Sequence, residues 1–102
     1  MKLITIVDAR ASLQKLVGQD LPLPAAWAVM QLADACNVHL NFYGTERGKL
    51  GPDPDPEKLA ELHDLEVGSP AAEKIRIALA DNVRLSAVDL KALEPFVDFY
   101  QN

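Results

Sequence analysis

The sequence predicts an α+β domain that is mostly helical, with one long central helix, shorter helices and a small antiparallel sheet of two or three strands. Two patterns predict this class. Apolar side chains recur every three or four residues between Ala26 and Tyr43, which is typical of a helix. Residues 74–79 instead alternate between polar and apolar side chains, which is typical of a strand with one exposed face. With 102 residues, the chain is long enough for one domain, residues 1–102.

The first segment, residues 2–7, favours a strand because it is short, apolar and rich in β-branched side chains. Asp8 then offers an N-cap for a short helix that Gly18 ends in a left-handed conformation. The alternative is a helix that begins near Thr5, because periodicity alone cannot assign so short an apolar run. We expect the strand at residues 2–7 to pair antiparallel with the strand at 74–79 and to pack on the long helix.

The long helix is predicted to begin at Pro24, which suits a first helical turn because its missing N–H is not needed there. Its end stays open between Gly44 and Gly51, since glycine weakens a helix by about 1 kcal/mol relative to alanine. Trp27 and Met30 lie off the main apolar stripe, so the first half of the helix is apolar on two faces. A helix of this kind in so short a chain favours self-association.

The second half of the chain begins with an exposed connector at about residues 51–56, where alternating prolines exclude both a helix and a central strand. Pro56 opens the next predicted helix, and residues 74–79 follow as a strand. Asp81 and Asn82 predict a turn.

A last helix is predicted after Ser86, which with Asp89 resembles a capping box. Pro95 breaks or kinks this helix, and we expect the apolar tail beyond it to dock on the body or on a partner. The helix is expected to bury Val88, Leu90 and Leu93. The residues predicted to form the core of the whole domain are Leu13, Leu16, Val29, Ala33, Cys36, Leu40, Leu62, Ile75, Ile77, Leu90 and Leu93.

The charge balance disfavours two classes of partner. Fifteen acidic and ten basic side chains leave a net charge of −5, which supplies few cations for nucleic acid or for anionic membrane. No apolar run approaches the roughly 20 residues that cross a bilayer, and Asp8 comes too early for the core of a signal peptide. We therefore expect a cytoplasmic protein that binds neither membrane nor nucleic acid.

The residues that could carry chemistry are few. Cys36 and His39 lie three apart on the predicted helix, and His63 with Asp64 could complete a set of metal ligands, but spacing of this kind is common by chance. No nucleotide-binding glycine pattern occurs, and no serine lies in a catalytic motif. We expect no catalytic, cofactor or metal site. The serines considered as nucleophiles are Ser12, Ser69 and Ser86.

Several segments resemble a known group of proteins. The chain opens with an MKL-type segment, continues with the early helix ASLQKL and reaches an LP-x-x-x-A-aromatic junction over residues 21–27. Leu40, Tyr43, Arg47 and Leu50 follow in the phase of an L-x-x-F-x-x-x-R-x-x-L pattern, and the end reads LSAVDLKALEPFVDF. Together these resemble short phage- and prophage-encoded proteins of unassigned function from Firmicutes. The resemblance implies a phage origin, a bacterial host cell and no enzymatic activity.

The function predicted from these observations is that of a non-enzymatic phage or prophage accessory or assembly protein. It is expected to act through protein contacts with itself, as a dimer, or with another phage protein. Aromatic and methionine side chains dominate contact energies at interfaces. The alternative is an acidic regulator or antitoxin-like protein that neutralises a nucleic-acid-binding partner. The candidate interface residues are Trp27, Met30, Phe96, Phe99 and Tyr100.

Overall fold

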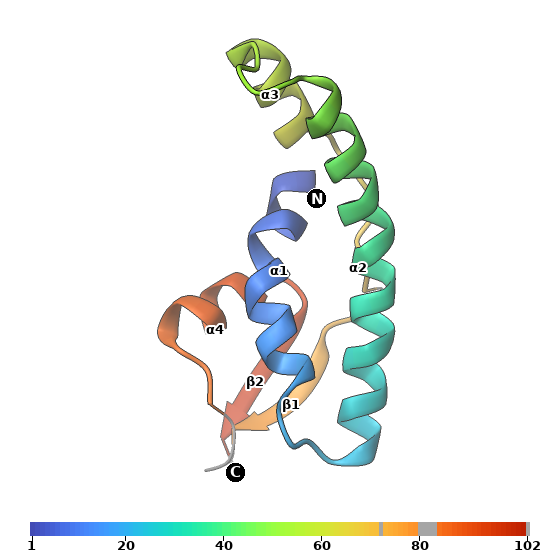
Figure 1. The fold of residues 1–102 in the computed structure, drawn as a ribbon. Helices are drawn as coiled ribbons and strands as arrows, with labels where there is room; N and C mark the ends of the chain where they lie inside the picture. Colours follow the sequence, from blue (N-terminus) through green and yellow to red (C-terminus); the bar gives the residue numbers. More distant parts are fainter. Residues whose placement is uncertain (72, 80–83, 102) are drawn as a thin grey trace.

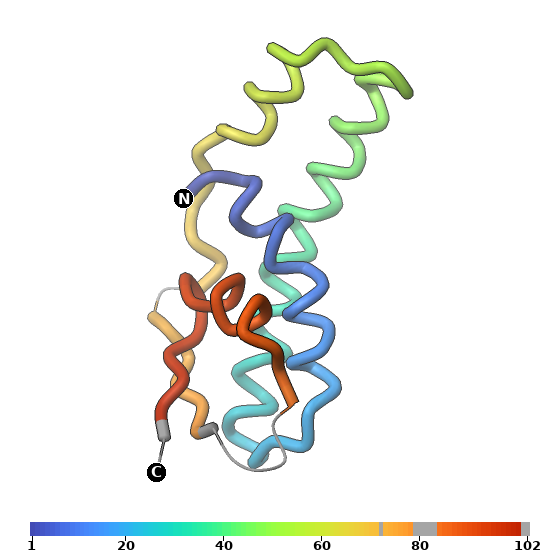
Figure 2. Tube along the Cα trace, turned by 90° about the vertical axis from the view of Figure 1, so that its left-hand side faces the viewer, coloured from blue at the N-terminus to red at the C-terminus, as the bar shows by residue number. Residues whose placement is uncertain are grey.

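The computed structural model describes residues 1–71, 73–79 and 84–101. Two long helices run side by side in opposite directions, and a third folds back at one end of the molecule (Figures 1 and 2). A strand, a short helix and a second strand complete the fold, which measures 47 × 23 × 19 Å. The elements are α1 (Leu3–Val17), α2 (Leu23–Lys49), α3 (Pro56–His63), β1 (Ile75–Leu79), α4 (Ala87–Leu93) and β2 (Val97–Gln101).

The prediction of a strand at residues 2–7 is wrong, because the helix α1 begins at Leu3. Leu3 and Ile6 are 0% and 1% exposed and continue the buried helical face that Leu13 and Leu16 also occupy. Burial of that face outweighs the modest strand preference of β-branched side chains. Asp8 lies inside the helix rather than at its N-cap, and Gly18 ends the helix with a right-handed φ of −81°.

The sheet is parallel, so the predicted antiparallel pairing is also wrong. Within the described residues it has two strands, and β1 pairs with β2 from Ile75 opposite Val97 to Leu79 opposite Gln101. Parallel neighbours need a crossover connection, and α4 supplies it between the two strands (Figure 1). The N-terminus makes only an isolated antiparallel bridge between Lys2 and Glu66.

The long predicted helix is confirmed and is longer than its periodic stripe. α2 has 27 residues, starts one residue before Pro24 and continues through Gly44 and Gly48. Its last residue is Lys49 and its C-cap is Leu50, after which Gly51 takes the left-handed φ of 78° that glycine adopts without strain. The helix therefore extends about 40 Å along the molecule.

Alanine substitutions at Gly44 and Gly51 should change the stability of the protein in opposite directions. A Cβ at Gly44 meets no atom within 4 Å, so Gly44→Ala should stabilise the protein by about 1 kcal/mol. Gly51→Ala should destabilise it by about 1–2 kcal/mol, because alanine resists a positive φ. Urea unfolding followed by circular dichroism measures the free energy of unfolding of both variants. Changes of the same sign would contradict the assignment of Gly51 as the left-handed residue after the end of α2.

The two shorter helices begin as predicted. Asp55 caps α3 by accepting from the Glu57 N–H at 3.0 Å, and Pro56 occupies the first turn. Ser86 and Asp89 form the capping box of α4. The prediction that Val88 is buried is wrong, because its side chain is 76% exposed. The predicted turn at residues 81–82 lies outside the described residues.

The core lies between α1, α2, α4 and the inner face of the sheet. Six of the predicted core residues are buried, and Ala33, Leu40 and Ile75 pack against them half-buried. Leu62 and Leu90 are also half-buried. None of the helices in the described part of the chain combines the length and apolarity of a membrane span. The buried residues that sequence reasoning missed are Leu3, Ile6, Ala9, Leu32, Phe96 and Val97.

Candidate interaction surface

The C-terminal candidate residues lie in different surroundings. Phe96 is 1% exposed and belongs to the core, so it is not available to a partner. Phe99 is half-buried against the same core. Tyr100 is 37% exposed, and its ring lies under the Arg76 guanidinium at 4.7 Å. The tail therefore docks on the body of the protein, and only Tyr100 retains an exposed ring.

Trp27 and Met30 lie on an exposed apolar face of α2. They are 62% and 52% exposed, and further large apolar residues follow at helical spacing along the same side. At 100° per residue this stripe lies opposite the buried Val29, Leu32 and Cys36. We call this stripe the outer face of α2. It consists of Leu23, Trp27, Met30, Val38 and Phe42, whose exposures range from 44% to 85%.

Sequence reasoning identified two of these residues and missed the other three. Leu23 precedes Trp27 by four residues, and Phe42 follows Val38 by four, so both pairs carry the helical spacing. That spacing was visible in the sequence, but it could not show which of the two apolar faces the rest of the chain covers. Only the packing of α1 against α2 decides that question.

The outer face is nearly free of charge. Between Leu23 and Thr45 the helix carries one carboxylate, Asp34, and one histidine, His39, and no lysine or arginine. His39 is half-buried and contacts the Ala35 carbonyl of its own helix through Nδ1 at 3.1 Å. A mostly apolar face with one carboxylate, Asp34, on a protein of net charge −5 is closer in composition to a contact surface than to a solvated helix.

A groove of about 330 Å³ lies between the C-terminal half of α2 and α3. Phe42 belongs both to this groove and to the outer face, so the two surfaces are continuous. Tyr43 of α2 contacts the end of α3, because its hydroxyl lies 3.1 Å from His63 Nε2 and its ring stacks on the imidazole. The groove is lined by Phe42, Glu46, Leu50, Lys58, Glu61, Leu62 and Leu65.

A larger and more polar groove of about 650 Å³ runs between α1 and α2. Among the described residues that line it, Arg10 alone is ionisable, and Gln14, Asn37, Asn41 and Thr45 supply the other polar groups. These described residues offer no acid and base pair for proton transfer.

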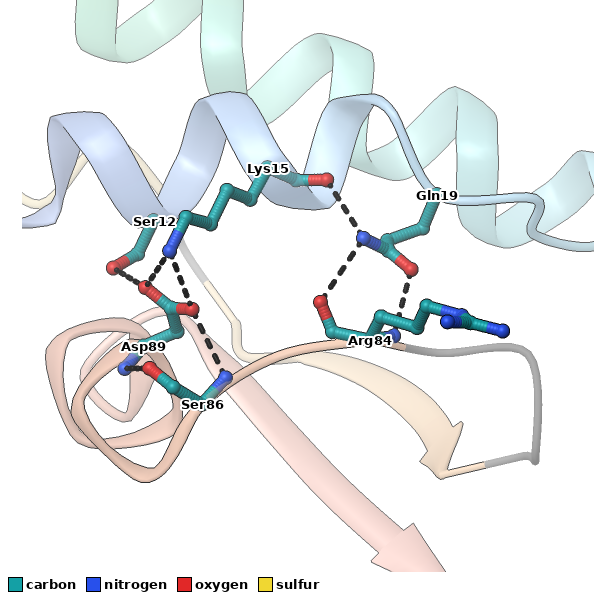
Figure 3. A network of polar contacts seen from close by, with 6 residues as sticks. All are labelled: Ser12, Lys15, Gln19, Arg84, Ser86 and Asp89. Atoms are coloured by element: carbon teal, nitrogen blue, oxygen red, sulfur yellow. Dashed lines mark hydrogen bonds and ion pairs between the residues drawn. The ribbon is translucent and has the colours of Figure 1, made fainter.

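Ser12 and Ser86 belong to structural contacts of Asp89, and the Ser69 hydroxyl donates to the Ala71 carbonyl at 2.8 Å. Asp89 is 4% exposed and accepts from the Ser12 hydroxyl at 2.7 Å, the Lys15 ammonium at 3.1 Å and the Ser86 N–H at 3.0 Å (Figure 3). These contacts, with the Ser86 N–H as the largest influence, hold the pKa of Asp89 well below its usual range. The cluster fastens α4 to α1, and Ser12 and Ser86 serve as hydrogen-bond partners of its carboxylate.

The candidate metal ligands are not brought together. Cys36 is 1% exposed in the core, and burial raises the pKa of its thiol to about 11, so it stays protonated near neutral pH. His63 instead contacts Tyr43, and Asp64 pairs with Lys2 at 3.3 Å. Among the described residues, no group of three or more His, Cys, Asp and Glu side chains could hold a metal ion.

Comparison of the chain with protein-family models, with curated proteins and with solved structures found no match. The phage origin that the terminal motifs imply therefore stays a prediction.

Proposed function

We propose that this protein is a non-enzymatic accessory or assembly protein that associates with a second copy of itself through the outer face of α2. The observation that carries the proposal is the exposure of five large apolar side chains in one stripe along a helix whose opposite side is buried. Exposed contiguous apolar surface of this kind marks interaction sites in proteins. Trp27 is expected to contribute most to the contact energy, because tryptophan contributes strongly at interfaces.

Charge favours a second copy as the partner. A strongly charged partner gains little from a face whose one full charge is Asp34. Two identical faces related by a two-fold axis can cover each other without opposing long rows of like charge. A dimer built in this way removes the apolar stripe of both chains from water at once. The setting that the sequence resemblance predicts for such a module is a phage or prophage.

Light scattering across a dilution series tests the proposal. The unmodified chain should form a dimer, and the double variant with Trp27→Ala and Met30→Ala should raise the dissociation constant by about 100-fold or more. This magnitude follows because truncating a dominant contact residue costs about 2 kcal/mol or more, the dimer loses that side chain from both copies, and each 1.4 kcal/mol is tenfold. Circular dichroism should show that the variant keeps its helices, because both side chains are exposed.

The matched control is Val88→Ala, which removes an exposed apolar side chain from α4, away from the outer face. Its dissociation constant should equal that of the unmodified chain. A chain that stays monomeric at all concentrations, or a double variant that associates normally, would refute the proposal.

A further inference from the structure

We propose that the two copies pair their α2 helices antiparallel and that Trp27 of each copy inserts into the groove between α2 and α3 of the other. This inference rests on the proposed self-association and adds the arrangement of the two chains. Its starting point is that the outer face and the groove are continuous through Phe42.

The area of the contact requires more than α2. A helix of 27 residues is about 40 Å long and about 10–12 Å wide, so its face gives a flat footprint of somewhat under 500 Å². A stable interface buries about 800 Å² on each partner. A neighbouring element must therefore supply part of the contact, and the groove formed with α3 adjoins the outer face through Phe42.

The position of Asp34 favours the antiparallel orientation, and full overlap of the two helices sets the register. In a parallel dimer the two Asp34 side chains would face each other inside the apolar contact, which is unfavourable for like charges. In an antiparallel dimer whose α2 helices overlap over their full length, the two-fold axis passes at the height of the middle residue, Cys36. Asp34 then lies opposite Val38 of the second copy, and Met30 lies opposite Phe42. All four of these positions lie along the exposed side of α2.

The same register brings Trp27 to the groove. Trp27 lies opposite Thr45 of the second copy, at the height of Phe42 and Glu46, which line the groove with α3, while Thr45 itself lines the polar groove between α1 and α2. A volume of about 330 Å³ accommodates one indole, and Leu65, which is 40% exposed, would be covered by it. The residues that precede and follow Trp27 are uncharged from Leu21 to Ala33, so no ionisable group enters the groove with it.

The rim of the groove suits an indole ring. Lys58 lines the groove and makes no ion pair in the described part of the chain, so its ammonium is available to the face of the ring. Glu61 offers a carboxylate to the indole N–H, which needs an acceptor when tryptophan is buried. Apolar walls with a cation and an acceptor at the edge are the surroundings that tryptophan selects.

Fluorescence of the unmodified protein provides the first test, because Trp27 is the only tryptophan in the chain. As the concentration rises through the dissociation constant measured by light scattering, the emission maximum should shift to shorter wavelength and quenching by acrylamide should fall. Leu65→Lys blocks the groove and should raise the dissociation constant at least tenfold. Ala60→Lys, which adds the same charge to α3 outside the groove, should leave it unchanged.

A mixing experiment separates the groove contact from other dimers. The proposed dimer has two contacts between Trp27 and a groove. Trp27→Ala chains keep the groove but lack the tryptophan, and Leu65→Lys chains keep the tryptophan but have a blocked groove, so either homodimer loses both contacts. The mixed dimer keeps one, in which Trp27 of the Leu65→Lys chain enters the groove of the Trp27→Ala chain. The mixture should therefore associate more tightly than either variant alone. If the protein dimerises but Trp27 emission stays that of an exposed indole, or mixing gives no gain, this inference is overturned and self-association stands. A monomer at every concentration overturns the proposed function itself.

Discussion

Phe96→Ala should remove a large part of the stability of this protein. Phe96 is 1% exposed and packs in the core where the chain passes from α4 into β2. Truncating a buried phenylalanine costs about 3–5 kcal/mol, because transfer free energy is lost and a cavity remains. The whole domain is expected to be stable by about 5–15 kcal/mol. Urea unfolding should therefore show a midpoint far below that of the unmodified protein.

Two further variants make this expectation specific to burial. Phe96→Leu keeps most of the volume and should lose only part of the stability. Tyr100→Ala removes a ring that is 37% exposed and should change the free energy of unfolding by about 1 kcal/mol or less. Normal stability with impaired self-association in Phe96→Ala would instead return this residue to the interface where sequence reasoning placed it.

Asp89→Asn should lower the melting temperature at neutral pH by roughly 10 °C. Asparagine keeps the shape of the side chain but cannot accept from the Ser12 hydroxyl, the Lys15 ammonium and the Ser86 N–H together. The fastening of α4 to α1 and the capping box of α4 would both weaken. Differential scanning calorimetry measures the change.

The pH dependence of stability gives the same site a distinct signature. The pKa of Asp89 is lowered in the folded protein, chiefly by the Ser86 N–H, relative to about 3.9 in an unfolded chain. Its contribution is therefore complete above pH 3.9 and is lost progressively as the pH falls below that value. In Asp89→Asn, the part of the stability loss at acid pH that comes from protonation of Asp89 should disappear. The control is Asp98→Asn, which removes an exposed carboxylate that lies 3.8 Å from Arg76. An unchanged acid profile in Asp89→Asn would contradict the assignment.

Local signals in the sequence predicted much of the helical framework. Pro24 and Pro56 lie at the start of α2 and α3, and the box formed by Ser86 and Asp89 opens α4. These features act within one helical turn, so the neighbouring residues suffice to recognise them. The apolar character of the outer face around Trp27 was readable for the same reason, because helical spacing alone places side chains on a common face.

The tertiary structure decided the features that depend on distant residues. Leu3 and Ile6 are helical because α1 buries them in the common core, which a short apolar run cannot reveal. The strand at Ile75 pairs with Val97 in parallel, because α4 carries the chain back across the sheet. The groove at Phe42 exists only because α3 folds back on α2.

The sequence by itself therefore determined where helices start and which side chains are apolar, because both depend on residues within a few positions of each other. Tertiary structure decided which apolar side chains are covered. Phe96 follows α4 and Trp27 lies within α2, and although both are aromatic, one is 1% and the other 62% exposed. The difference arises because burial depends on the elements that fold over a residue, and those elements are brought there by long-range packing.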